Sequence, residues 1–133
     1  MVWFTVIIQE EGEDEMPLLN EGTRFLIDTL KSRINEVVFG FDGTIATQQD
    51  GGIGNPAVVV TPTVRVVDDN SLVVEAKLAL DVAFNRPLKE VVIRYKNPSD
   101  STDTTDFMRY TYNAIEKGSN NEIQFSALIE VTV

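Results

Sequence analysis

The sequence contains no cysteine and no histidine. The absence of cysteine excludes disulfides, thiol nucleophiles and cysteine-ligated metals. The absence of histidine removes the commonest general base and the usual zinc ligand, and it makes a Ser-His-Asp triad impossible. We therefore expect no catalytic residues, no cofactor-binding residues and no metal-binding residues in this chain.

Basic residues are also scarce, since 11 Lys and Arg stand against 21 Asp and Glu and give a formal net charge of -10. Such a surface repels phosphate backbones, and no local basic patch offsets it, so we expect no direct nucleic-acid binding. No apolar run approaches the roughly 20 residues that cross a bilayer. The apolar start VWFTVII lacks the basic flank and cleavage site of a signal peptide, which predicts synthesis in the cytoplasm and no membrane partner.

Hydrophobic residues make up 43% of the 133 residues, enough for a single domain, 1–133, with a core of its own. One segment alone has helical spacing. Asn20 is a good N-cap, and it predicts a helix at about 21–33. Five residues recur at helical spacing and predict one buried stripe: Leu19, Thr23, Leu26, Leu30 and Ile34.

The rest of the chain predicts β-structure. Runs at 2–8, 37–41, 58–67, 72–84, 88–96, 107–115 and 123–133 are β-branched or alternate between apolar and polar residues. Pro62 indicates that the run 58–67 lies at a sheet edge or carries a bulge. The run 72–84 predicts one long strand with a single buried face. Strand after strand with turns between them predicts a mainly β fold, an antiparallel β-sandwich with one N-terminal α-helix.

The stretch VVFGFDGTI, at 37–45, resembles the start of a haloacid-dehalogenase-type phosphatase. That chemistry needs a nucleophilic aspartate two residues before Asp42, and this chain has Gly40 there. The phosphatase fold also needs several βαβ units after the motif, whereas this sequence continues with strands. A tight Asp-Gly turn at the end of a short strand explains the stretch better, and we expect that the protein is not an enzyme.

Two acidic clusters and one tryptophan leave alternatives open. The stretch EEGEDE, at 10–15, suits a solvated loop or an acidic docking or cation-binding patch. Asp100, Asp103 and Asp106 recur every third residue, but without the spacing of an EF-hand, so a solvated polar loop is favoured over a calcium site. Trp3 stands in an apolar strand, which is more typical of a core than of a sugar-binding platform.

Several short motifs occur in a characteristic order. A helix with the pattern N-x-G leads to VVFGFDGT, a loop closes on GIGNPAV, and the alternating strand SLVVEAKLALDVAF is followed by NRPLKEVVIRY. This order resembles a family of small structural proteins and tail-fibre or baseplate domains of tailed phages and archaeal tailed viruses. One extra residue interrupts the family's G-x-G-T pattern here, and Ile93-Arg94 replaces its late Gly-Leu. Beside Asp42, Gly54 and Glu90, the matching positions are Asn20, Gly22, Gly40, Gly43, Thr44, Asn55 and Pro56.

The resemblance implies a virion structural protein, such as a tail, baseplate, neck or fibre subunit, located in the virion. It implies protein–protein assembly with copies of itself and with neighbouring virion proteins, as a homo-oligomer of threefold or sixfold symmetry. It carries over no catalytic residue. The alternative left open is a non-viral β-sandwich module for binding or adhesion, or the subunit of an extracellular filament.

Overall fold

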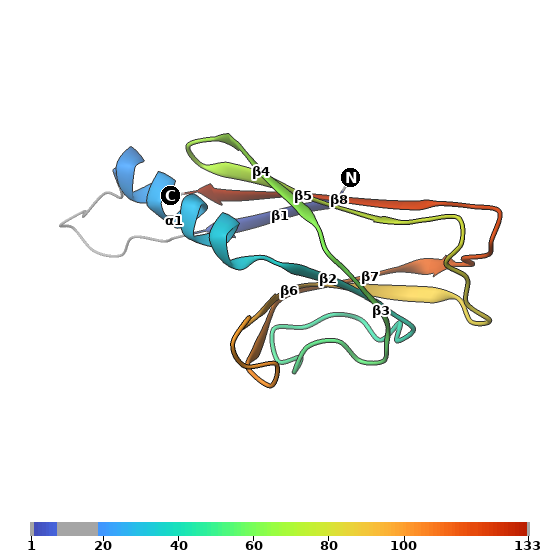
Figure 1. Ribbon diagram of the computed structural model, residues 1–133. Coiled ribbons are helices and arrows are strands. Elements are labelled where there is room, and N and C mark those ends of the chain that lie inside the picture. Colours follow the sequence, from blue (N-terminus) through green and yellow to red (C-terminus); the bar gives the residue numbers. More distant parts are fainter. Residues whose placement is uncertain (1, 8–18, 133) are drawn as a thin grey trace. The chain divides into compact units, whose positions relative to one another are not determined.

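The computed structural model describes residues 2–7 and 19–132, with side chains from 19 to 131. The chain divides into two compact units: the first is Met1–Arg33, Thr63–Glu75 and Phe125–Val133, and the second is Ile34–Pro62 and Ala76–Gln124. The described strands form two four-stranded sheets (Figure 1). The predicted class, mainly β with a helix near the N-terminus, is confirmed. The single domain expected for 1–133 stays a prediction.

The first sheet has the strand order β1-β8-β5-β4. Its strands are β1 (Val2–Ile7), β8 (Ile123–Thr132), β5 (Ser71–Leu78) and β4 (Thr63–Asp68). β4 and β5 pair antiparallel, whereas β1 and β8 pair parallel, so the sheet joins the first strand of the chain to the last. The core side chains of this sheet are Leu72, Val73, Val74, Phe125, Ala127, Ile129 and Val131.

The helix α1 spans Asn20–Arg33, which confirms the prediction of about 21–33. The amide of Thr23 donates to the carbonyl of Leu19 (2.9 Å), so Leu19 takes the N-cap position expected for Asn20. Thr23 and Ile27 are buried, and Ile34 is buried just beyond the helix end. The predicted stripe is therefore correct at Thr23 and Ile34 but wrong at Leu19, which is 67% exposed. Leu26 and Leu30 are half-buried, and the buried Ile27 was not among the predicted positions.

The second sheet has the strand order β3-β2-β6-β7. Its strands are β3 (Pro56–Val60), β2 (Glu36–Gly40), β6 (Leu88–Lys96) and β7 (Thr104–Ile115), and its pairs are antiparallel. Consecutive residues of both central strands, Val37–Phe39 and Val91–Ile93, are buried. Because side chains of a strand alternate, both faces of this sheet are covered at its centre. β7 lies at one edge and has 12 residues.

Three predicted strands have clearly different bounds in the structure. The strand predicted at 107–115 begins earlier, because β7 starts at Thr104. The run 58–67 divides at Thr61 and Pro62 into the end of β3 and the start of β4. Each of these two strands lies at an edge of its own sheet, as Pro62 indicated. The run 72–84 stops at Leu78, and the prediction of a strand to residue 84 is wrong.

The early end of β5 has a physical cause in residues 79–84. The amide of Val82 closes a turn on the carbonyl of Ala79 (3.2 Å), and the carbonyl of Val82 accepts from the Lys117 ammonium. The amide of Phe84 donates to the Lys117 carbonyl (2.9 Å). These backbone groups find partners outside a sheet ladder, so the alternation of apolar residues does not continue the strand.

Two expectations fall outside what the structure describes. The acidic stretch 10–15 lies outside the described residues, and so does the side chain of Trp3. Among the described residues, no helix is long and apolar enough to cross a membrane.

Candidate functional site

A buried carboxylate fixes the connection between β2 and β3, residues 41–55, called here the 41–55 loop. Glu90 on β6 is fully buried. Its Oε2 accepts from the amides of Asp42 (2.7 Å) and Asn55 (2.9 Å), and its Oε1 accepts from the amide of Gly54 (2.8 Å). One side chain of the sheet centre thus ties together the two ends of a long loop.

Arg109 on β7 completes this arrangement. Its Nε donates to Glu90 Oε1 (3.0 Å), and its Nη1 donates to the Thr44 carbonyl (2.9 Å) and to the Asp50 carboxylate (3.0 Å). Its Nη2 donates to the Asp42 carbonyl (3.1 Å). We call Glu90, Arg109 and the loop atoms they bind the loop clamp. Burial lowers the pKa of Arg109, but its bonds to Glu90 and Asp50 and their charges outweigh this, and the pKa is raised.

A second tie comes from Asp106, also on β7. Its carboxylate accepts from Arg94 Nε (2.6 Å) and from the amide of Ile53 (3.0 Å). Arg94 also lies 3.7 Å from a carboxylate oxygen of Glu36 on β2. The C-terminal end of the 41–55 loop is therefore held by β7 as well as by Glu90 on β6.

The aspartates at 100, 103 and 106 do not meet in one site. Asp100 accepts from the amide of Thr102 (3.0 Å), and Asp103 accepts from Asn97 Nδ2 (3.1 Å) in the turn before β7. Asp106 belongs to the strand and to the 41–55 loop. In the part of the chain that the structure describes, no group of acidic side chains could hold a metal ion.

Glycine is required where the 41–55 loop approaches the clamp. A Cβ on Gly40 would lie 2.6 Å from the Asn55 carbonyl oxygen and 2.6 Å from Glu90 Oε2, closer than real Cβ contacts allow. A Cβ on Gly43 would lie 3.0 Å from the Lys89 side chain. Gly40 thus allows backbone and carboxylate to pack together, whereas Gly43 faces only the flexible Lys89 side chain.

The structure brings most of the predicted motif positions together. Five of them, Gly40, Gly43, Thr44, Asn55 and Pro56, belong to the end of β2, the 41–55 loop and the start of β3. Asn20 and Gly22 lie on α1 in the other unit and take no part in the clamp. Sequence reasoning placed Glu90 in the pattern but missed Arg109. An arginine within the run FMRYTY was the available signal, because charged groups on half-buried strands need partners.

The clamp leaves Glu90 little capacity for chemistry. Its carboxylate already accepts four hydrogen bonds, so its lone pairs are occupied and are not offered to a metal or to a substrate proton. Asp42 accepts from the amide of Thr44 (2.9 Å), which together with the Thr44 side chain and the Arg109 charge lowers its pKa. β2 runs into the antiparallel β3 rather than a helix, so the βαβ context of the phosphatase motif does not follow.

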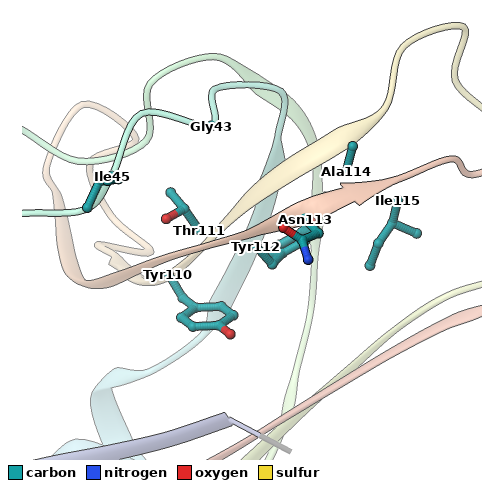
Figure 2. A pocket seen from close by; sticks show the side chains of 8 residues that line it. All are labelled: Gly43, Ile45, Tyr110, Thr111, Tyr112, Asn113, Ala114 and Ile115. Atoms are coloured by element: carbon teal, nitrogen blue, oxygen red, sulfur yellow. The ribbon is translucent and has the colours of Figure 1, made fainter.

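A shallow groove lies beside the clamp, along β7. It is lined by Gly43 and Ile45 of the 41–55 loop and by the consecutive residues Tyr110–Ile115 (Figure 2). Thr111 points toward the loop, whereas Tyr110 projects from the opposite face of the strand. Because residues from both faces line one hollow, the groove runs along the outer edge of β7. We call it the edge groove.

From the contacts of the loop clamp we expect the folded protein to lose stability in acid. The Thr47 amide donates to Asp50, and with the Arg109 bond this lowers the pKa of Asp50 below its ordinary 3.8. A carboxylate with a lowered folded-state pKa contributes stability that is present above its ordinary pKa and is lost as the pH falls through the folded-state value. We expect the urea concentration at the midpoint of unfolding to decrease when the pH is lowered below about 4. In Asp50→Asn this decrease should be smaller. An unchanged pH profile in Asp50→Asn would contradict this.

Comparison with known proteins gives no family for the chain. No family model matches the sequence, and no curated protein is significantly similar to it.

Proposed function

We propose that this protein is a structural subunit of a virion of the tailed-virus type, and that it works by protein–protein assembly rather than by catalysis. The observation that carries the proposal is the open edge of β7 beside a firmly held loop. An edge strand presents a row of backbone N–H and C=O groups that can pair with another chain. The order of motifs from Asn20 to Arg94 supports the viral setting.

β7 differs from the other edge strands whose side chains are described. β3 has five residues and begins with Pro56, and β4 has six and carries Arg65 and Asp68. Proline, charge and shortness are the devices by which proteins protect edges from pairing. β7 has 12 residues, and its stretch Tyr110–Ile115 contains neither a charge nor a proline. This half of the edge is suited to pairing.

Apolar side chains surround the same edge. Ile45 of the 41–55 loop is 80% exposed, and Phe107 and Ile115 of β7 are 38% and 39% exposed. The clamp already holds the loop that carries Ile45. Binding of a partner at Ile45 therefore costs little conformational entropy of this loop. A partner strand that pairs with β7 would bind its backbone groups and would also contact these exposed apolar side chains. The net charge of -10 opposes unspecific association, which leaves directional pairing as the route to assembly.

The symmetry depends on which edge meets β7. Pairing of β7 with β7 of a second copy gives a twofold dimer, because both copies use the same surface. The threefold or sixfold ring that we propose requires β7 to meet a different surface of the next copy. A neighbouring virion protein can supply that surface instead.

The molar mass of the purified protein in solution tests this proposal. We expect light scattering after size exclusion to show a trimer or hexamer that dissociates on dilution. Asn113→Lys places a charge on the exposed β7 edge, and we expect it to weaken association about tenfold, since a lysine on an edge strand protects that strand from pairing. Asn120→Lys makes the same change in an exposed turn outside β7 and serves as the control.

Three other outcomes distinguish between modes of association. A clean dimer would replace the ring with β7–β7 pairing. A monomer at every concentration, with and without Asn113→Lys, would contradict self-assembly and favour a module that binds a foreign segment. An equal effect of Asn113→Lys and Asn120→Lys on association would show that the β7 edge does not control it.

A further inference from the structure

A partly enclosed pocket of about 180 Å³ lies in the second unit, where the chain leaves β7. Residues 84–87, which precede β6, and residues 116–118, which follow β7, form its walls. Two cationic side chains, Arg86 and Lys117, line it together with one acid, Glu116. We call it the Lys117 pocket.

Lys117 is buried, with 1% of its surface exposed. Its ammonium donates to the carbonyls of Val82 and Gly118, the latter at 2.6 Å. An ammonium has three N–H donors, so these two bonds leave one donor over. Lys117 and Gly118 both line the pocket, so the bond from the ammonium to the Gly118 carbonyl joins two residues of its wall.

The charge of Lys117 is not neutralised by the described residues. Their ion pairs include no carboxylate within 4.0 Å of Lys117 or of Arg86. Two carbonyl groups satisfy hydrogen bonds but carry no net charge. A buried ammonium without a counter-charge is strongly unfavourable, so this site favours an anion beside it.

Arg86 supplies a second, oriented cation. Its guanidinium carbon lies 4.7 Å from the centroid of the Phe41 ring, and Phe41 in turn meets Phe84 edge to face at 5.8 Å. A guanidinium whose face rests on an aromatic ring keeps the N–H donors of its rim available. Planar oxyanions accept from such donors in pairs.

We propose that the Lys117 pocket binds one oxyanion group, a carboxylate or a phosphate. The net charge of the pocket lining is one positive charge, because Arg86 and Lys117 are cationic and Glu116 is anionic. A single bound anion offsets this charge. A pocket of about 180 Å³ admits one such group but not a whole nucleotide. The group can come from a free small anion or from an acidic side chain of a second copy, since the chain has 21 acidic residues.

Titration followed by backbone NMR signals tests the site. Sodium phosphate and sodium acetate are added separately at constant ionic strength, with sodium chloride as the reference. We expect the amide signals of Asn85 and Gly118 to move and to saturate with at least one of the two anions. Arg86→Gln, an exposed change, is expected to weaken this binding about tenfold, because it removes charge-assisted hydrogen bonds. Glu116→Gln is expected to strengthen it by removing a like charge.

The control and a dilution series complete the experiment. Arg65→Gln removes the same charge on β4, where Arg65 pairs with Glu75 at 3.4 Å, and should leave the titration unchanged. Without added anion, a concentration-dependent shift of the same signals that Arg86→Gln abolishes identifies a carboxylate of a second copy. If neither arm gives a saturable response, or if Arg86→Gln and Arg65→Gln behave alike, the proposal is overturned.

Discussion

Glu90→Ala is expected to lower the free energy of unfolding by about 3 to 5 kcal/mol, the usual result of breaking a buried ion pair from one side. The substitution removes the acceptor for three backbone amides of the 41–55 loop and for Arg109 Nε. It leaves the Arg109 guanidinium, 7% exposed, with Asp50 as its closest remaining carboxylate. Urea unfolding of the purified variant measures the loss.

The matched control is Glu75→Ala. Glu75 forms an ion pair with Arg65 (3.4 Å) between β5 and β4, but both side chains are about half exposed. Exposed pairs of this kind contribute up to about 1 kcal/mol. If Glu75→Ala and Glu90→Ala destabilised the protein equally, the clamp would not be a principal support of the fold.

Glu90→Gln separates charge from shape in the same position. The amide keeps the size of the carboxylate, but its NH₂ group would face N–H donors where Glu90 now has an accepting oxygen. We expect Glu90→Gln to recover only part of the stability lost in Glu90→Ala. Hydrogen exchange at the amides of Gly54 and Asn55 should become faster in Glu90→Ala, because both amides lose their acceptor. In Glu90→Gln only the amide that faces the NH₂ group loses its acceptor, so only one of the two should exchange faster.

Gly40→Ala is the second large expected effect. The added Cβ would lie 2.6 Å from the Asn55 carbonyl oxygen and 2.6 Å from Glu90 Oε2. One of these atoms is backbone, and the other is held by four hydrogen bonds to its carboxylate, so neither can move away easily. We expect a loss of about 1 to 3 kcal/mol, the range for overpacked positions, measured by the same urea unfolding.

Gly51→Ala provides the control within the same loop. A Cβ there meets no atom within 4 Å. Replacing glycine by alanine without strain reduces the freedom of the unfolded chain, so Gly51→Ala should be neutral or stabilise the protein by up to about 1 kcal/mol. A similar loss in Gly40→Ala and Gly51→Ala would mean that contact with the clamp does not limit position 40.

The fold class and most elements follow from the pattern of the sequence. β6 has the predicted bounds, 88–96, because its apolar run ends at polar residues on both sides. The strand predicted at 72–84 failed because a distant side chain, Lys117, binds the backbone at Val82, and alternation carries no information about such a partner. The parallel pairing of β1 with β8 was likewise beyond local pattern, since it depends on contacts between residues more than a hundred positions apart.

The candidate site was predictable in part for similar reasons. Short glycine motifs indicated a tight Asp-Gly turn after the strand and a loop that closes on GIGNPAV, and Glu90 was included by its place in the pattern. What joins them is one carboxylate and one guanidinium on neighbouring strands, β6 and β7. Arg109 stands 19 residues from Glu90, and no spacing rule links the two. Which strand lies at a sheet edge is also decided by the three-dimensional pairing.

The pairing of β1 with β8 has a consequence for synthesis. Val2 aligns with Ala127 and Ile7 with Thr132, so β1 meets its partner only after almost the whole chain has left the ribosome. At about 5 to 20 residues per second, the apolar segment 2–7 waits roughly 6 to 25 s without that partner. The contacts of this sheet are far apart in sequence, which slows folding. A newly made chain is therefore most prone to mispairing before β8 is complete, and premature release would leave an unpaired β1 ready to join a neighbour.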